Sequence, residues 1–363
     1  MVMHRYQVIE VPEFKIQNSK LMFDPIRILI INTGGTIGMV KEKETGTLHA
    51  VKADELFRHI PILSQLDEQI SFYSFDPLMD SSNMCPRHWI EIAAVIEENY
   101  EQYDGFVVLH GSDTMAYTAS ALSFMLENLN KPVILTGSQL PLGMVRSDGR
   151  ENLTAAIEIA SAREEDTPIV PEVCIYFENL LLRGNRTFKY NADNFKAFHS
   201  GNLPPLAEVG VNIKFNHNII LKPNFKKLKV HTNLDPSITN IKLYPGISEA
   251  TIAAQLGIPG LRAAILETYG SGNAMTDSWF LDLLRSAISK GIILMNVTQC
   301  KAGSVVMGKY QTSEEMNRMG VISGKDMTVE SAIAKLMYLL GTGLPKSEVE
   351  SLLQVSLRGE MTV

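Results

Sequence analysis

Short apolar runs alternate with helix-like patterns through the first half of the chain. Residues 28–31 and 106–109 each contain four consecutive apolar residues, which is too short for a helix. Runs that are apolar at every position are typical of strands buried on both faces of a parallel sheet. Apolar residues with helical spacing follow at 86–100, 115–129 and 151–162. This repeated order of strand, turn and helix predicts an α/β fold with a larger, doubly wound, mostly parallel N-terminal domain.

The later part of the chain repeats the pattern on a smaller scale. Residues 224–240 are rich in Lys, Thr, Asn, Asp and Pro, which is typical of a linker. Beyond it, strand-like runs alternate with helical spacing, so we expect a smaller C-terminal α/β domain. The predicted division is an N-terminal arm at 1–25, an N-terminal domain at 26–223, a linker at 224–240 and a C-terminal domain at 241–363.

Composition narrows the class of protein. The 363 residues are enough for two hydrophobic cores, and the net charge of −7 argues against nucleic acid or an anionic membrane as a partner. The sequence contains neither an apolar run of about 20 residues, as a membrane span requires, nor a signal peptide pattern. The cysteines, Cys85, Cys174 and Cys300, lack the spacing of a zinc or redox motif. We expect a cytoplasmic protein without metal or other cofactor.

The turn Thr33-Gly34-Gly35-Thr36 follows the first buried run. Adjacent glycines allow backbone angles that other residues avoid, and they let a ligand approach the main chain. The carboxyl ends of strands in open α/β sheets are where ligands bind. Taken alone, the turn is better explained by threonines that cap backbone N–H groups than by a ligand site. A dinucleotide site is disfavoured because that motif needs glycine where Thr36 stands.

A second polar turn, His110-Gly111-Ser112-Asp113-Thr114, follows the strand at 106–109. Alone it is a helix cap, because acidic side chains are favoured at helix N-termini. Two hydroxyl-bearing turns at the same sheet edge can line one pocket. A carboxylate in that pocket would attract an ammonium group and repel a phosphate. An amino acid is therefore a better candidate substrate than a nucleotide.

Two further segments supply chemistry that is weak in isolation. Lys189 in a loop is by default a solvated charge, but beside a serine it can accept the hydroxyl proton, as in Ser-Lys nucleophilic systems. Asp80-Ser81-Ser82 lies at a third strand end and offers a carboxylate and two hydroxyls. By itself this segment is only a turn.

Together these segments resemble the bacterial-type L-asparaginases, and most closely their cytoplasmic type I branch. The motifs occur in order from about residue 26 to the C-terminus, across both domains. They are Thr-Gly-Gly-Thr-Ile at 33–37, Leu-Met-Asp-Ser-Ser at 78–82, His-Gly-Ser-Asp-Thr at 110–114, Gly-Asn-Arg-Thr-Phe-Lys at 184–189, Tyr-Pro-Gly-Ile at 244–247, Tyr-Gly-Ser-Gly-Asn-Ala at 269–274 and Thr-Gln-Cys at 298–300.

The resemblance implies hydrolysis of L-asparagine to L-aspartate and ammonia in two steps. Thr36 would be the nucleophile, which forms an acyl-enzyme that water then hydrolyses. Ser112, Asp113 and Lys189 would form the second catalytic group, and they would manage the protons. A weak hydroxyl nucleophile needs a neighbouring base and an oxyanion hole, and backbone N–H groups around Gly111 could supply the hole.

The resemblance also implies how substrate is held. The substrate-binding residues would be Asp80, Ser81, Ser82, Ser112, Asp113 and Asn273. Asn273 would enter the site of a partner subunit, because the family's active sites lie between the subunits of homodimers, and pairs of these dimers form homotetramers.

Two departures from the family pattern bear on activity. The family usually has threonine in place of Ser112, so a methyl group that fixes the rotamer is missing. Many members also carry a tyrosine on the loop near 47–48, whereas this chain has none between residues 39 and 72. Tyr310 is a candidate to replace it.

Two other functions stay open at this stage. One is the ammonia-releasing amidase subunit of a tRNA-dependent amidotransferase, which usually carries a substantial extra N-terminal domain; residues 1–25 are too few for one. The other is a catalytically retired asparagine-binding protein. Retention of Thr36, Asp113 and Lys189 argues against it.

Overall fold

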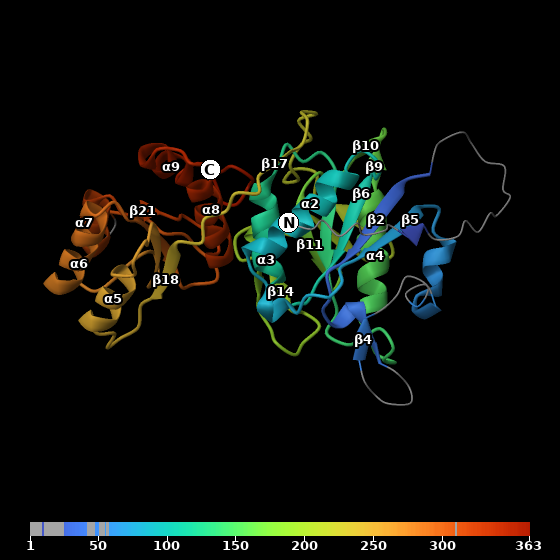
Figure 1. The fold of residues 1–363 in the computed structure, drawn as a ribbon, viewed down its shortest axis with the longest axis horizontal. Coiled ribbons are helices and arrows are strands. Elements are labelled where there is room, and N and C mark those ends of the chain that lie inside the picture. The colour runs from blue at the N-terminus through green and yellow to red at the C-terminus, as the bar shows by residue number, and fades with distance from the viewer. Residues whose placement is uncertain (1–8, 11–24, 42–47, 51–54, 56–57, 309–310) are drawn as a thin grey trace.

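The computed structural model describes residues 9–10, 25–41, 48–50, 55, 58–308 and 311–363. Figure 1 shows two α/β units side by side: the larger N-terminal unit runs from blue to green, and the smaller C-terminal unit from orange to red. Across the described residues, no helix combines the length and the apolar character needed to cross a bilayer.

Nine strands of the described chain form the large sheet, in the order β1-β5-β2-β6-β8-β11-β12-β15-β16. The middle of this sheet is parallel and its ends are antiparallel. The strands are β1 (Ile9–Glu10), β2 (Arg27–Asn32), β5 (Gln69–Ser74), β6 (Gly105–Leu109), β8 (Val133–Thr136), β11 (Val173–Phe177), β12 (Leu180–Arg183), β15 (Ala207–Val209) and β16 (Ile213–Phe215). Part of the predicted N-terminal arm is thus paired with the sheet through β1.

Alternate residues of β2 face two different layers of helices. Leu29 and Ile31 pack in one core with helices α2 (Pro86–Asn99) and α3 (Met115–Met125). Ile28 and Ile30 pack in a second core with helix α4 (Gly149–Ser161). All four side chains are completely buried. The predicted doubly wound parallel arrangement is confirmed.

Helix α3 ends earlier than its apolar spacing predicts. The helix was expected to reach residue 129, but it stops at Met125. Leu126 and Glu127 then form strand β7 (Leu126–Glu127), which pairs with strand β17 (Lys229–Val230) of the predicted linker. The tertiary strand pairing overrides the local helical preference.

The C-terminal domain has a parallel sheet in the order β18-β19-β20-β21. Helices α5 and α6 cover one face of this sheet, and α8 covers the other and faces α3. Phe124 of α3 stacks on Tyr338 of α8, with ring centroids 6.0 Å apart. The elements are β18 (Ile238–Lys242), α5 (Glu249–Leu256), β19 (Ala263–Thr268), α6 (Ser278–Ser289), β20 (Ile293–Thr298), α7 (Gln311–Met319), β21 (Ile322–Ser323), α8 (Val329–Gly341) and α9 (Lys346–Leu353).

Candidate active site

Three turns meet at the carboxyl edge of the large sheet, after β2, β5 and β6. The distance between these turns is so short that a Cβ atom added to their glycines would collide with the neighbouring turn. A Cβ on Gly35 would lie 2.4 Å from the Gly111 Cα, and one on Gly111 would lie 2.4 Å from the Ser81 Oγ. A Cβ on Gly34 would lie 2.4 Å from the Met79 carbonyl oxygen. The glycines therefore allow the main chain of the Thr36 turn to pack against the main chains of the other two turns, and they allow the Ser81 side chain to pack against Gly111.

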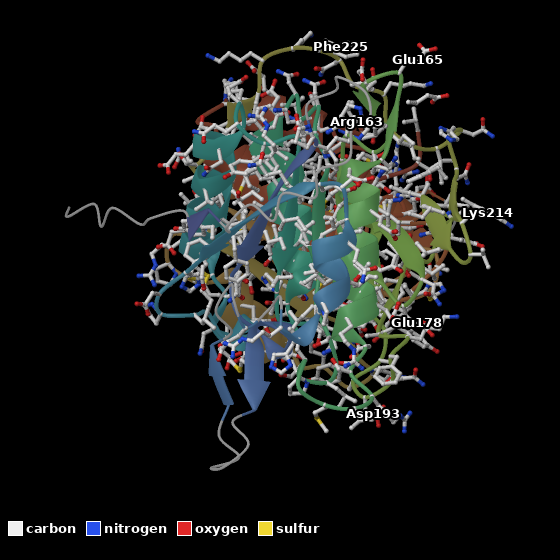
Figure 2. All side chains as sticks on the ribbon, turned by 90° about the vertical axis from the view of Figure 1, so that its right-hand side faces the viewer. Arg163, Glu165, Glu178, Asp193, Lys214 and Phe225 are labelled. Atoms are coloured by element: carbon white, nitrogen blue, oxygen red, sulfur yellow. The ribbon has the colours of Figure 1, made fainter. Side chains whose placement is uncertain are left out.

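Figure 2 looks onto the N-terminal domain and locates this edge. Glu178 directly follows β11, and Asp193 lies between strands β13 (Phe188–Lys189) and β14 (Phe198–His199). Both lie at the lower end of the view. Arg163 and Glu165 belong to the hairpin of β9 (Arg163–Glu164) and β10 (Thr167–Pro168), and they lie at the opposite end.

The two threonines of the first turn have different surroundings. Thr33 is buried, and its hydroxyl donates to the Leu109 carbonyl at 2.8 Å. Thr36 starts the short 3-10 helix η1 (Thr36–Gly38) and is only partly buried. Among the described residues, no side chain hydrogen bonds to the Thr36 hydroxyl. Thr33 therefore fixes the turn, and Thr36 is left available for a reaction.

Lys189 of β13 contacts the second turn directly. Its Nζ donates to Ser112 Oγ at 2.9 Å and lies 2.5 Å from Asp113 Oδ1. The Lys189 side chain is 20% exposed and the Asp113 side chain is 64% exposed, so solvent screens much of this ion pair. The exposed Asp113 carboxylate remains accessible to a second cation, and the amine is positioned to exchange a proton with the Ser112 hydroxyl.

The third turn carries Asp80, Ser81 and Ser82. Asp80 Oδ1 accepts a hydrogen bond from the Ser82 N–H at 2.9 Å, and backbone and side-chain hydrogen bonds from Ser82 lower the pKa of the Asp80 carboxyl. Ser81 is buried, and its carbonyl accepts from the Thr114 hydroxyl at 2.6 Å. Thr114 thus ties the second turn to the third. Asp80 stays ionised at neutral pH and exposed to solvent.

A buried relay of hydrogen bonds fixes the second turn from behind. Trp89 Nε1 donates to Thr118 Oγ1 at 3.0 Å, Thr118 Oγ1 lies 2.9 Å from His110 Nε2, and His110 Nδ1 lies 2.7 Å from the Gly111 carbonyl. An indole N–H only donates and a carbonyl only accepts, so Thr118 donates to Nε2 and the His110 proton is on Nδ1. Complete burial lowers the pKa of His110 to about 4, which keeps this ring neutral.

The relay was not predicted. His110 stood inside a recognised motif, but its role was invisible because its partners are residues of α2 and α3. In the sequence, Trp89 and Thr118 are only residues of predicted helices, and nothing indicates that they contact His110 or each other. The consequence of the relay is a fixed Gly111–Ser112 peptide, whose N–H faces the opposite way from the carbonyl that His110 holds.

Asn273 and Tyr310 differ from the other predicted residues. Asn273 lies in the turn after β19, where its backbone exchanges two hydrogen bonds of 2.8 Å with Tyr269. Its side-chain oxygen is buried and has no hydrogen-bond partner within the described part of the chain. The contacts of Asn273 are thus within the C-terminal domain, and they do not bring it into the cluster around Thr36. Tyr310 lies outside the described residues.

Comparison with known families now adds to this geometry. A model described as Asparaginase, N-terminal matches residues 27–221, and one described as Glutaminase/Asparaginase C-terminal domain matches residues 237–353. The chain belongs to the asparaginase family. The predicted resemblance is therefore confirmed, and so is the predicted combination of a large, mostly parallel domain with a smaller α/β domain.

Individual members of the asparaginase family cover the chain almost completely. L-asparaginase 1 of Escherichia coli K12 is 44% identical over 92% of this chain and 98% of its own length. The 60 kDa lysophospholipase of Mus musculus is 43% identical over 93% of this chain, but the chain spans only 63% of that relative's length. The crystal structure of L-asparaginase I from Vibrio cholerae matches with a TM-score of 0.85 and 46% identity, covering 94% of this chain and 100% of that structure's chain.

Proposed function

We propose that this asparaginase-family chain hydrolyses L-asparagine to L-aspartate and ammonia. The observation that carries the proposal is the contact of Lys189 with Ser112 and Asp113 at the meeting point of the three turns. A free hydroxyl, a lysine amine, a serine and an exposed carboxylate are the groups that acyl transfer on an amino-acid amide requires.

The first step uses Thr36 as the nucleophile. Its hydroxyl oxygen attacks the side-chain amide carbon, the C–N bond breaks, and protonated nitrogen leaves as ammonia. A threonine ester of aspartate remains, and water then cleaves it to regenerate the hydroxyl. Ser112 and Lys189 pass the protons in both steps. Backbone N–H groups from Gly111 to Asp113 stabilise the negative oxygen that develops in each.

The substrate is held by its α-amino and α-carboxylate groups. Asp113 binds the ammonium group as an exposed carboxylate, and the segment from Asp80 to Ser82 supplies a further carboxylate and hydroxyl donors. Asn273 of the partner subunit completes the site in a homodimer, and dimers associate into homotetramers. The free thiols of Cys85, Cys174 and Cys300 support a cytoplasmic location.

We also propose the domain division of the chain from the sequence: an N-terminal domain at 26–223, which carries the main catalytic residues, a linker at 224–240 and a C-terminal domain at 241–363. The described strands of the large sheet lie before the linker, and those of the small sheet begin at Ile238, just within it.

The test is ammonia release by the purified protein with L-asparagine, D-asparagine and L-glutamine in parallel. We expect turnover of L-asparagine, with weaker turnover of L-glutamine, because one methylene group is worth about 1–3 kcal/mol in a pocket. Binding of asparagine without ammonia release at high protein concentration would identify a retired enzyme and refute the proposal.

The name of the mouse relative makes lysophospholipid hydrolysis a second candidate. A phosphate-bearing substrate would meet the carboxylates of Asp80 and Asp113, which repel it. We therefore expect no fatty-acid release from lysophosphatidylcholine under conditions in which asparagine is hydrolysed. Fatty-acid release that Thr36→Ala abolishes would instead assign both reactions to this site.

A further inference from the structure

The C-terminal segment 356–362 is hydrogen bonded to residues 183–186, the stretch of chain that leads to Lys189. Three consecutive carbonyls of this segment accept hydrogen bonds from three side chains at 183–186. The donors and acceptors are Asn185 Nδ2 to Arg358 O at 3.0 Å, Arg183 Nη1 to Gly359 O at 3.4 Å and Arg186 Nη1 to Glu360 O at 2.9 Å. These hydrogen bonds therefore join residues 356–362 to residues 183–186, which are about 170 positions away in the sequence.

A buried ion pair gives the C-terminal segment its shape. Glu360 and Lys335 of α8 are both 0% exposed, and their charged atoms lie 2.7 Å apart. The Glu360 carboxylate also accepts from the backbone N–H groups of Leu357 and Arg358, at 3.0 and 2.7 Å. A buried charge pair whose remaining hydrogen bonds are satisfied holds its geometry, because loss of one partner leaves the other unpaired. The segment is thus a defined loop wrapped around one carboxylate.

Arg186 is anchored a second time, to the C-terminal domain. Its Nη2 donates to Asp326 Oδ2 at 2.9 Å and to Thr362 Oγ1 at 3.1 Å. Asp326 in turn accepts from the Thr362 N–H at 2.8 Å. Burial opposes ionisation of Asp326, but the hydrogen bonds from Arg186 and Thr362 lower the pKa of its carboxyl. Both nitrogens of the guanidinium fork are therefore used to fix one side chain.

The path from Arg186 to Lys189 is short and constrained. Residues Gly184–Arg186 form the 3-10 turn η4, and the Thr187 hydroxyl closes the turn by donating to the Arg183 carbonyl at 2.7 Å. Lys189 follows two residues later in β13. A displacement of η4 would therefore also displace the Lys189 backbone, because few backbone torsions lie between the two.

We propose that Asn185, Arg186 and Thr362 are positioning residues, through which the C-terminal segment holds the Lys189 amine against Ser112. This inference rests on the proposed function for the role of Lys189. A displacement of about 1 Å at a reacting group can cost about 10²-fold in rate. Asn185→Ala removes one neutral hydrogen bond, so we expect it to displace Lys189 by less than about 1 Å. The expected consequence is a fall in kcat of about tenfold. KM should change less than kcat, within about twofold, because the Asp80–Ser82 turn has no contact with the C-terminal segment among the described residues, and Asp113 lies on the second turn, which the variant leaves in place.

The test compares crystal structures and steady-state ammonia release of wild type, Asn185→Ala and Asn99→Ala. Asn99 is the matched control, since its buried amide also donates to a single backbone carbonyl, that of Val95 at 2.8 Å, away from η4. We expect Asn185→Ala to lengthen the Lys189 Nζ to Ser112 Oγ distance beyond about 3.5 Å and to lower kcat, and Asn99→Ala to change neither.

A second pair of variants examines the C-terminal side without replacing a charged residue. Thr362→Val removes the hydroxyl, which accepts from Arg186 and donates to Asp326 Oδ2, and Thr362→Ser keeps it. We expect a lower kcat for Thr362→Val and recovery of kcat with Thr362→Ser. A lower thermal unfolding midpoint with wild-type kcat would indicate a structural role only.

Failure of the inference and failure of the proposed function give different results. If wild type releases ammonia and Asn185→Ala keeps both kcat and the 2.9 Å contact, the positioning role is wrong. If wild type releases no ammonia, the proposed function is wrong, and the crystal structures still decide the inference. A retained Lys189–Ser112 contact in Asn185→Ala would overturn it, and a lost contact would support it.

Discussion

The turns that carry Thr36 and Ser112 are held by contacts within the N-terminal domain, whereas the segment that leads to Lys189 is also held by residues 326–362 of the C-terminal domain. Gly35 and Gly111 let two turns of one domain touch without any side chain between them. Lys189 depends on Arg186, which reaches Asp326 and Glu360 beyond the linker. The first half of the site is therefore rigid through local packing, and the second half is rigid only when both domains are assembled.

Removal of the reacting groups should give the same large loss in both halves. We expect Thr36→Ala and Lys189→Met each to lower kcat by about 10⁴-fold or more, since groups that act together lose activity together. Circular dichroism and gel filtration should be unchanged. Thr36→Ser keeps a hydroxyl and should retain measurable turnover. Normal turnover in Thr36→Ala would exclude Thr36 as the nucleophile.

Gly35→Ala should damage the first half through its backbone alone. Gly35 has a φ of 78°, and a Cβ there would lie 2.4 Å from two backbone atoms of Gly111. We expect an activity loss of about 10²-fold together with a lower unfolding midpoint, because neither backbone can yield cheaply. Gly246 is the control: its φ is 89°, but a Cβ there would meet nothing within 4 Å. Gly246→Ala should therefore cost stability only, and an equal activity loss in both variants would refute the packing argument.

The two halves should also lose stability in different ranges of acid pH. The pKa of His110 in the folded chain is about 4, below its ordinary value of 6.5, because the ring is buried. Between these values the unfolded chain binds the proton and the folded chain does not, so stability falls as the pH drops from 6.5 to about 4. The pKa difference of about 2.5 corresponds to roughly 3 kcal/mol.

Asp326 on the Lys189 side behaves differently in acid. Its folded pKa is lowered from 3.8, so its contribution is complete above 3.8 and is lost as the pH falls further. Thermal unfolding midpoints from pH 7.5 to 3 should separate the two ranges. His110→Asn should abolish the loss of stability between pH 6.5 and about 4, and it should leave the loss below pH 3.8 unchanged. An unchanged midpoint profile in His110→Asn would contradict the assignment.

Ser112→Thr should have the smallest effect. The added methyl restores the residue that the family usually carries and restricts the rotamer of the hydroxyl that Lys189 contacts. We expect kcat within about threefold of wild type, since the hydrogen-bonding group is unchanged. A loss above tenfold in steady-state ammonia release would mean that the pocket around Lys189 is shaped for serine.

The first half of the site was predictable from sequence because its determinants are local. Four apolar residues at 28–31 predict a buried strand, and the glycines after them predict a close approach of the main chain. The local pattern alone does not distinguish Thr33 from Thr36, since both are threonines beside a glycine; the family resemblance assigns the nucleophile to Thr36, and the structure turns the Thr33 hydroxyl inward to Leu109. The end of α3 at Met125 was missed for a related reason, because its cause is a strand of the linker.

The anchoring of Lys189 could not be predicted because its determinants are distant and chemically ordinary. Arg186 and Asp326 are separated by 140 positions, and a single arginine or aspartate carries no signal of its partner. Lys335 and Glu360 occur in a helical pattern and a polar tail, where each reads as a solvated charge. Their complete burial follows only from the packing of α8 between the small sheet and α3.

The hydrogen bonds between residues 356–362 and residues 183–186, which lead to Lys189, also have a consequence for protein synthesis. Chains emerge from the ribosome N-terminus first, at about 5–20 residues per second, and domains generally fold as they emerge. The N-terminal domain can therefore form its sheet and the three turns of the site while residues 326–362 are still being made. Lys189 receives its anchors only after Asp326 and residues 358–362 have been translated, so a nascent chain that has not yet reached them would hold its substrate pocket open but catalytically incomplete.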